Sequence, residues 1–442
     1  MDANYLETYG SAVDYLFGLH RIGIKLGLDN IHALLDFLKR PERRYATIHI
    51  AGTNGKGSTA AMLYSILKDV GYRTALYTSP HLVSFTERIR VNDVVIPKDA
   101  VLEFTRGIAP LADRLKASFF EVTTAMAFWY FREQKVDVAV IECGMGGRLD
   151  STNILKPLAT VITPISLDHT NYLGSSLQSI VREKAGIIKP GITCLTNNGN
   201  TTVRAFLKKI CRQKKSPFAD VRSVVQVNNR ACDLAGCRFD LKFQDGTARR
   251  IHLPLSGAYQ IENARLAAAA AKILSEKLEI SNSNIYNGLR NVHWPARLQV
   301  IDEHPLTIVD VSHNPEGFRE SLKFIQNCVE NRALNCVLSL QADKNFSPIA
   351  ELLGANCQQV YVVPLRKGKP QKPEILCGAI RQAGGRARIV PSVPAALHLR
   401  QKHNEDTLWL ITGSHYLAGE VFELLQIPVV QTAPKSVFGP VA

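Results

Sequence analysis

The sequence predicts an α/β protein with an N-terminal P-loop domain on a parallel sheet and a smaller, Rossmann-like C-terminal α/β domain. Its 442 residues are enough for two or three domains. From residue 47 onward, short apolar runs alternate with helical patterns, which is typical of a parallel sheet covered by helices. A glycine-rich loop at 47–59 joins a β-branched run to a helical pattern. We place the boundary near residue 296, which gives domains 1–295 and 296–442.

The expected elements follow from hydrophobic spacing. Leucine and isoleucine at helical spacing predict helices within residues 1–45. Further strands of the first domain are expected at 73–78, 136–142 and 158–163, with a helix at 122–134. Residues 217–255 alternate and contain many turn residues, which predicts a small antiparallel excursion before an alanine-rich helix at 263–274. The second domain is expected to have strands at 306–311, 335–339, 358–363, 387–390 and 407–412.

Composition favours an anionic ligand. Lys and Arg exceed Asp and Glu by 53 to 39, a net charge of +14, and a basic excess attracts anions by long-range steering. Nucleic acid is not supported, because the sequence has no helix-turn-helix, zinc-finger or RNP-like pattern. Phosphorylated and polycarboxylate small molecules explain the charge equally well. The N-terminus lacks a signal-peptide pattern, and no apolar run approaches the roughly 18 residues of a membrane span. We therefore expect a cytoplasmic protein with no membrane partner.

The nine cysteines show no metal or disulfide pattern. No C-x-x-C occurs, and Cys232 and Cys237, the closest pair, have no accompanying histidine pair at zinc spacing. An odd, scattered set is typical of a reducing compartment. We expect structural thiols.

The loop Gly52–Ser58 predicts a phosphate-binding site and hence an ATPase domain. Glycines let backbone N–H groups converge on phosphate oxygens, the following helix adds partial positive charge, and Lys56 adds a full one. Ser58 or Thr59 can face a magnesium ion. The spacing is irregular for a P-loop, because Gly57 stands between Lys56 and Ser58. The alternative is a glycine-rich turn without a ligand.

Polar residues stand at the ends of the neighbouring predicted strands. Ser79, Glu142 and Asp168–His169 each follow an apolar run, so they are expected at the ligand-binding edge of the sheet. A carboxylate beside a phosphate loop suits magnesium. The alternative for Glu142 is a helix-capping or turn residue, and a lone histidine is usually structural.

Two further segments allow different interpretations. By spacing alone, 182–187 (REKAGI) is the solvated face of a helix. Asp310–Pro315 follows a strand of the second domain, so its polar groups are expected to point into the interdomain cleft together with Arg297. The alternative is a turn that caps the next helix.

Nine motifs in order resemble the folylpolyglutamate and dihydrofolate synthases of the Mur-ligase superfamily. They are AGTNGKGS, YTSPHL, FFE, IECGMGGRLDSTN, SLDHTNYLG, REKAGI, the helix that contains Asn263, Arg297 and DVSHNP. The similarity spans about residues 12–420. Ser312 departs from the pattern, which more usually has alanine before the histidine, and we expect no loss of activity from it.

The resemblance implies a set of site residues. For ATP it implies Thr53, Asn54, Gly55, Lys56, Gly57, Ser58, Asn263, Arg297 and Asp310. For magnesium it implies Ser79, Glu142 and His169. For the pterin-bearing substrate it implies Gly23, Ile24, Lys25, Phe119, Phe120, Glu121, Leu149, Asp150 and Ser151. Lys56, Lys184 and His313 are implied as catalytic, with Lys184 carbamylated and therefore not on a solvated face.

The resemblance also implies the reaction. Members of the family transfer the γ-phosphoryl group of ATP to a carboxylate, and the amine of L-glutamate then displaces phosphate. The expected substrates are dihydropteroate, folates or both, and a monomer is expected. A Mur-type peptidoglycan ligase is disfavoured, because only about 45 residues precede the loop, fewer than a typical domain. A nucleic-acid-stimulated P-loop ATPase is the alternative from another functional class.

Overall fold

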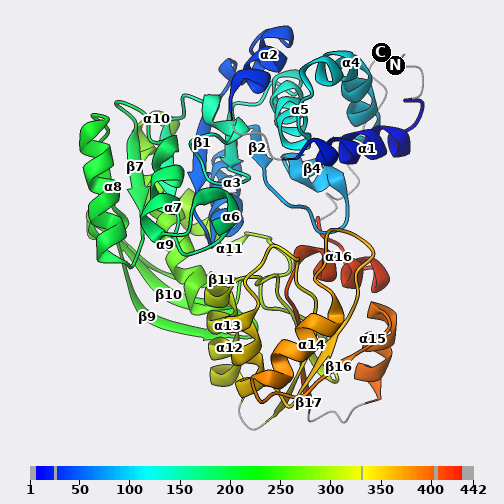
Figure 1. Ribbon diagram of the computed structural model, residues 1–442. Helices are drawn as coiled ribbons and strands as arrows, with labels where there is room; N and C mark the ends of the chain where they lie inside the picture. Colours follow the sequence, from blue (N-terminus) through cyan, green and yellow to red (C-terminus); the bar gives the residue numbers. More distant parts are fainter. Residues whose placement is uncertain (1–5, 24–26, 330–331, 403–406, 431–442) are drawn as a thin grey trace, which may run out of the picture.

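The computed structural model describes residues 6–23, 27–329, 332–402 and 407–430 (Figure 1). It is a mixed α/β structure in which a large domain around an eight-stranded sheet adjoins a C-terminal domain around a six-stranded sheet. Within the described residues, no helix is long and apolar enough to cross a membrane.

The sheet of the large domain has the order β4-β3-β2-β5-β1-β6-β7-β8. Its strands are β1 (Ala46–Ala51), β2 (Thr74–Tyr77), β3 (Ile89–Val91), β4 (Val94–Val95), β5 (Val138–Glu142), β6 (Ala159–Ile162), β7 (Thr193–Thr196) and β8 (Phe218–Asp220). The six neighbouring strands β2, β5, β1, β6, β7 and β8 are parallel, whereas β3 and β4 form an antiparallel edge. The predicted strands at 73–78, 136–142 and 158–163 are confirmed.

Helices cover both faces of this sheet. The helices of the large domain are α1 (Tyr9–Gly18), α2 (Asp29–Phe37), α3 (Lys56–Val70), α4 (Lys98–Leu115), α5 (Phe119–Glu133), α6 (Thr170–Leu173), α7 (Leu177–Lys184), α8 (Thr201–Gln213), α9 (Ala258–Ile273), α10 (Ser275–Leu278) and α11 (Asn282–Arg290). Alternate residues of β5 separate two cores: Val138 and Val140 pack with α3, α9 and α11, and Ala139 and Ile141 pack with α4 and α5. Burial on both faces explains why these strands are continuously apolar.

The antiparallel excursion is confirmed, but it begins later than expected. β9 (Val225–Asp233), β10 (Gly236–Phe243) and β11 (Ala248–Leu253) form a separate three-stranded antiparallel sheet. Residues 218–220 instead extend the large parallel sheet as β8. In Figure 1 the ribbon of β9–β11 runs from the large domain toward α12 and α13 of the C-terminal domain.

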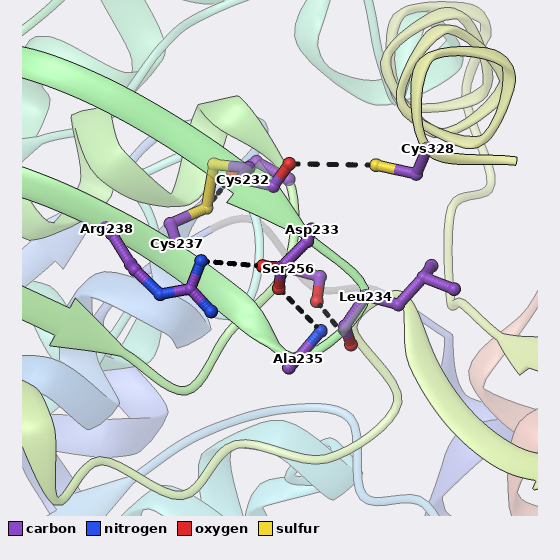
Figure 2. The surroundings of a disulfide bond; sticks show 9 residues. Cys232, Asp233, Leu234, Ala235, Cys237, Arg238, Ser256 and Cys328 are labelled. Atoms are coloured by element: carbon purple, nitrogen blue, oxygen red, sulfur yellow. Dashed lines mark hydrogen bonds and ion pairs between the residues drawn. A yellow bond between two sulfur atoms is a disulfide. The ribbon is translucent and has the colours of Figure 1, made fainter.

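One disulfide corrects the expectation that all nine cysteines are thiols. Cys232 of β9 and Cys237 of β10 are register partners across the hairpin, and their sulfur atoms are bonded (Figure 2). The remaining seven cysteines are free. The Sγ of Cys328, on α12 of the C-terminal domain, points toward the backbone oxygen of Cys232 at 3.8 Å. Sequence spacing did not reveal the pairing because it depends on the hairpin register.

The C-terminal domain has a sheet of order β12-β13-β17-β14-β15-β16. Its elements are β12 (Gln299–Glu303), β13 (Leu306–Val309), α12 (Pro315–Cys328), β14 (Ala333–Leu338), α13 (Ser347–Asn356), β15 (Gln359–Val362), α14 (Pro373–Gln382), β16 (Ala387–Ile389), α15 (Val393–Gln401), β17 (Thr407–Thr412) and α16 (His415–Leu424). Only β12 is antiparallel to its neighbour. The five strands expected here are confirmed.

Candidate active site

A cavity of about 720 Å³ lies between the two domains. The carboxyl ends of the neighbouring strands β2, β5, β1 and β6 meet at the edge that bounds it, as the sequence predicted. Twelve of the predicted site residues line it: Thr53, Asn54, Gly55, Lys56, Gly57, Ser58, Ser79, Glu142, Asn263, Arg297, Asp310 and His313. The structure therefore brings the predicted phosphate loop together with Arg297, Asp310 and His313 of the C-terminal domain.

The loop between β1 and α3 depends on glycine. Gly55 caps α3 with φ at +85°, and a Cβ there would collide with the side chain of Asn263 on α9. A Cβ at Gly57 would lie 2.8 Å from Cζ2 of Trp294. The backbone N–H groups of the first turn of α3 have no partner within the helix, so they remain available for an anion.

Gly55→Ala is expected to weaken nucleotide binding about tenfold or more, because Gly55 and Asn263 both line the cavity and both must move. Relief of the left-handed backbone strain, roughly 1–2 kcal/mol, would displace the loop itself. Titration calorimetry with the ATP analogue AMPPCP measures this. Gly71→Ala is the matched control, since Gly71 ends the same helix at φ +105° with open space around its Cβ. It should lose stability and keep its affinity. Equal affinities of the two variants would contradict the role of the close approach.

Lys56, Glu142 and Ser79 form the charged floor of the cavity. Glu142 ends β5 and is buried, with Oε2 accepting a hydrogen bond from the backbone N–H of Ser79 at 3.3 Å. Its Oε1 lies 3.9 Å from Nζ of Lys56. Burial raises the pKa of Glu142, and Lys56 opposes the rise. The negative charge of this buried carboxylate is therefore only weakly neutralised by neighbouring protein groups.

A buried carboxylate with spare oxygen lone pairs fits a divalent cation. Magnesium is usually held by one or two protein oxygens, with phosphates and waters completing the shell. Glu142 and the adjoining Ser79 can supply those oxygens from the floor of the cavity. Within the described residues, no group of three or more His, Cys, Asp and Glu side chains forms a metal site.

His169 belongs to a different set of contacts. It is the N-cap residue that precedes α6, with φ at +51°, and its Nδ1 lies 3.9 Å from Oδ2 of Asp343 in the C-terminal domain. Burial lowers the pKa of His169 to about 4, although Asp168 opposes the decrease. The ring is therefore neutral at pH 7, the form in which histidine binds a metal.

Lys184 is buried, not solvated. It ends α7 with 3% of its surface exposed, and its Nζ donates a 2.7 Å hydrogen bond to the backbone oxygen of Gly52. Burial, with Lys56 as the next contributor, lowers the pKa of Lys184 to about 7. The solvated face expected from spacing alone is wrong for this residue. The amine instead lies directly beneath the phosphate loop.

The segment 310–314, which follows β13, forms the wall of the cavity opposite the phosphate loop. Asp310 is buried and accepts hydrogen bonds from the N–H of Leu298 and Ser312 and from the hydroxyl of Ser321 at 2.6 Å. The unusual Ser312 joins this network, because its Oγ lies 3.0 Å from Oγ of Ser321. Asp310 is therefore held rigidly at the cavity wall.

A direct contact between the domains occurs at the phosphate loop. The side-chain amide of Asn54 donates to Glu316 Oε2 at 2.9 Å, and Asn314 donates to Asn54 Oδ1 at 2.9 Å. Asn314 also caps α12 by accepting from the N–H of Gly317. Glu316 was not among the predicted residues, and nothing in the linear sequence signals its contact with a loop 262 residues away.

Those predicted pterin residues that the structure describes are not among the residues that line the cavity. Phe119, at the start of α5, stacks on His20 with ring centres 4.2 Å apart and on Phe17 at 5.4 Å. Phe17 in turn lies 6.1 Å from His81, which does line the cavity. This aromatic group therefore adjoins the cavity through His81.

Several of these residues make hydrogen bonds within their own loops. Glu121 closes the cap of α5 by accepting from the N–H and hydroxyl of Ser118 at 2.7 and 2.8 Å. Asp150 accepts from the N–H groups of Met145 and Thr152. Phe120 packs against Gly144, Leu149 is partly buried and Ser151 is buried. Gly23 is exposed, and Ile24 and Lys25 lie outside the described residues.

Sequence reasoning missed further residues of the site. Trp294 and His415 line the cavity, and the ring of Trp294 lies 5.9 Å from the guanidinium of Arg297. Trp294 stands three residues before Arg297, but no sequence motif distinguished it from the domain boundary near residue 296. Lys344, in the loop after β14, donates a hydrogen bond to Asp168 of the large domain, and no sequence motif indicated this contact.

Comparison with known proteins identifies the family. The family models of the Mur ligase middle domain and the Mur ligase glutamate ligase domain match residues 50–271 and 296–415. The chain is 34% identical to the folylpolyglutamate synthase of Lacticaseibacillus casei over 431 residues, covering 96% of this chain and 99% of the relative. It is 31% identical to the dihydrofolate synthase/folylpolyglutamate synthase of Bacillus subtilis over 428 residues, covering 95% and 99%. The solved structure of Escherichia coli FolC in complex with DHPP and ADP is 28% identical with a TM-score of 0.84, covering 95% and 98%. The chain therefore belongs to the Mur ligases, in the group of ATP-dependent folylpolyglutamate and dihydrofolate synthases.

Proposed function

We propose that this protein joins L-glutamate to dihydropteroate and to the glutamate tail of folates, with conversion of ATP to ADP and phosphate. The observation that carries the proposal is the interdomain cavity of about 720 Å³, in which the loop 53–58 faces Arg297, Asp310 and His313. Nucleotide and acceptor can meet there only when both domains contribute. The bifunctional name of the Bacillus subtilis relative supports both steps.

The reaction needs charge neutralisation and exclusion of water. The γ-phosphoryl group of ATP moves to the substrate carboxylate, and the amine of glutamate then attacks the acyl phosphate and releases phosphate. Lys56 and the N–H groups of α3 hold the phosphates, and Arg297 neutralises charge from the opposite wall. Asn263 and Asp310 hold the nucleotide, and His313 lies beside the γ-phosphate. Domain closure keeps water from the acyl phosphate.

We assign the magnesium position to Glu142 and Ser79, which line the cavity, and we keep His169, which is not among the lining residues, as the third ligand that the sequence predicts. The ion supplies charge neutralisation at the phosphate oxygens. Lys184 reacts with carbon dioxide as the neutral amine, forming a carbamate and releasing one proton. The lowered pKa of about 7, caused by burial and Lys56, supports this assignment because it leaves much of the amine neutral at pH 7.

A paired assay tests the function. Phosphate release from ATP is expected only when glutamate and a pteroate-type acid are both present. Dihydropteroate and tetrahydrofolate are offered separately with ATP, magnesium and labelled glutamate, and label must enter the folate product. Incorporation with tetrahydrofolate alone would restrict the enzyme to folylpolyglutamate synthesis. A full rate without glutamate, or stimulation by DNA or RNA, would contradict the ligase function.

The aromatic group around Phe119 suits the pterin ring. The rings of Phe119, Phe17 and His20 are stacked on one another. Aromatic side chains of this kind also stack on flat heterocycles. The remaining predicted substrate residues, among them Leu149, Asp150 and Ser151, shape the loop beside it. Monomeric state and cytoplasmic location stay predictions from the sequence.

A further inference from the structure

Two consecutive residues of the C-terminal domain pair with two consecutive residues of the large domain. Nζ of Lys344 donates a 2.9 Å hydrogen bond to Oδ1 of Asp168, 176 residues away. The neighbouring Asp343 places its Oδ2 3.9 Å from Nδ1 of His169. Lys344 faces Asp168 while the preceding Asp343 faces the following His169, so the two contacts together specify how the two loops align.

The pair between Lys344 and Asp168 is shielded from solvent. Their side chains are 9% and 8% exposed. Exposed ion pairs contribute little to the free energy of folding. Removing one partner of a buried pair, in contrast, leaves an uncompensated buried charge, which is strongly destabilising. An ion pair of this kind favours the arrangement in which the domains touch.

Asp168 connects Lys344 to the active site. Besides Lys344, its Oδ1 accepts a 2.8 Å hydrogen bond from the backbone N–H of His169. Its Oδ2 faces Nε2 of His313 at 3.6 Å. The Asp168 carboxylate is therefore in contact with three groups: the amine of Lys344, the backbone N–H of His169 and the ring of His313.

His313 is constrained from both sides of its ring. Nδ1 lies 3.0 Å from the backbone oxygen of Val311, and because a carbonyl oxygen only accepts, Nδ1 carries the hydrogen. Nε2 is then directed at Asp168. Movement of Asp168 would remove the group that faces Nε2 of His313, and His313 lines the cavity.

We propose that Lys344 is a positioning residue of the ligase reaction, which binds Asp168 across the domain interface and thereby fixes His313 and the His169 loop in the closed site. This inference rests on the proposed function. Within the described residues, Lys344 makes no hydrogen bond or ion pair with the phosphate loop. Its effect is on the catalytic step of the closed enzyme.

Lys344→Met tests the proposal by removing the charge and keeping most of the side chain. We expect kcat to fall about 10²-fold, the cost of a misplaced reacting group, with a smaller rise in the Kd of AMPPCP. Rates are expressed per AMPPCP-binding site counted by calorimetry, so loss of folded protein alone leaves kcat unchanged. Lys323→Met, an exposed lysine on α12 of the same domain, is the matched control. Equal kcat in the two variants would overturn the proposal.

A double-mutant cycle shows whether Lys344 acts through Asp168. The variant with both Lys344→Met and Asp168→Asn should be no slower than the slower single variant. Losses that multiply would overturn the proposal. Lys344→Arg should recover part of the rate that Lys344→Gln loses, and these two variants replace the methionine variant if it does not fold. Equal rates for arginine and glutamine would also count against it.

Failure of the proposed function is distinguished by a readout without turnover. Small-angle scattering of the wild type with AMPPCP should give a more compact particle than that of Lys344→Met, whatever the substrate. If the wild type shows no glutamate-dependent phosphate release but this difference is present, the ligase function fails and the interdomain contact stands. If the difference is absent, the positioning role fails.

Discussion

Lys184→Ala is expected to lower kcat by about 10³-fold, because it removes the only group from which the proposed carbamate forms. The buried amine, with its pKa lowered to about 7 by burial and Lys56, has on the order of 10³ times more neutral form at pH 7 than an ordinary lysine. The neutral fraction decreases below pH 7, so removal of bicarbonate should inactivate the wild type most readily at low pH. Steady-state rates at pH 6 and 8, with and without bicarbonate, measure this.

Rescue by a small acid separates chemistry from packing in this variant. Formate or acetate can occupy the space that the lysine leaves and supply a carboxylate, so either should restore part of the activity. Lys189→Ala is the matched control. Lys189 lies five positions after Lys184, and its amine also donates to a backbone oxygen, that of Asn153. It should keep its rate and its magnesium dependence. Unchanged magnesium dependence in Lys184→Ala would count against the carbamate.

Lys56→Met should also reduce kcat by on the order of 10³-fold, because it removes a full charge from a site where phosphoryl charge develops. It also leaves Glu142 without its nearest cation. The KM for ATP should rise less than kcat falls. Lys68→Met controls for charge and helix content, since Lys68 lies on the same helix α3 and pairs with Asp93 outside the cavity. Comparable kinetics of the two variants would rule out a role for Lys56 at the phosphates.

The sequence predicted the strand ends well, because apolar runs and glycine loops are local signals. The loop 52–58, Ser79 and Glu142 all lie where a parallel sheet was expected to place them. Burial of Lys184 was not visible in its helical spacing. Its neighbour Arg182 is exposed while Lys184 points under the loop, and only the resemblance to the family indicated the difference.

Other features depend on contacts that no local pattern encodes. The disulfide between Cys232 and Cys237 required the hairpin register, and β8 joined the large sheet although residues 217–255 alternate throughout. Glu121 and Asp150 are occupied by capping hydrogen bonds, and their place at a substrate stays a prediction. Lys344 and Glu316 became visible only when the two domains were seen together.

The bridge from Asn54 to Asn314 and Glu316 has a consequence for the order of events in each cycle. Asn54 lies in the loop that we propose holds the phosphates, so the hydrogen bonds that join the domains would form part of the wall around bound ADP. Spent nucleotide cannot leave through that wall until the bridge opens. We therefore expect dissociation of ADP to limit the steady-state rate, which predicts a burst of product in the first turnover. Loss of the bridge in Asn54→Ala would remove the burst.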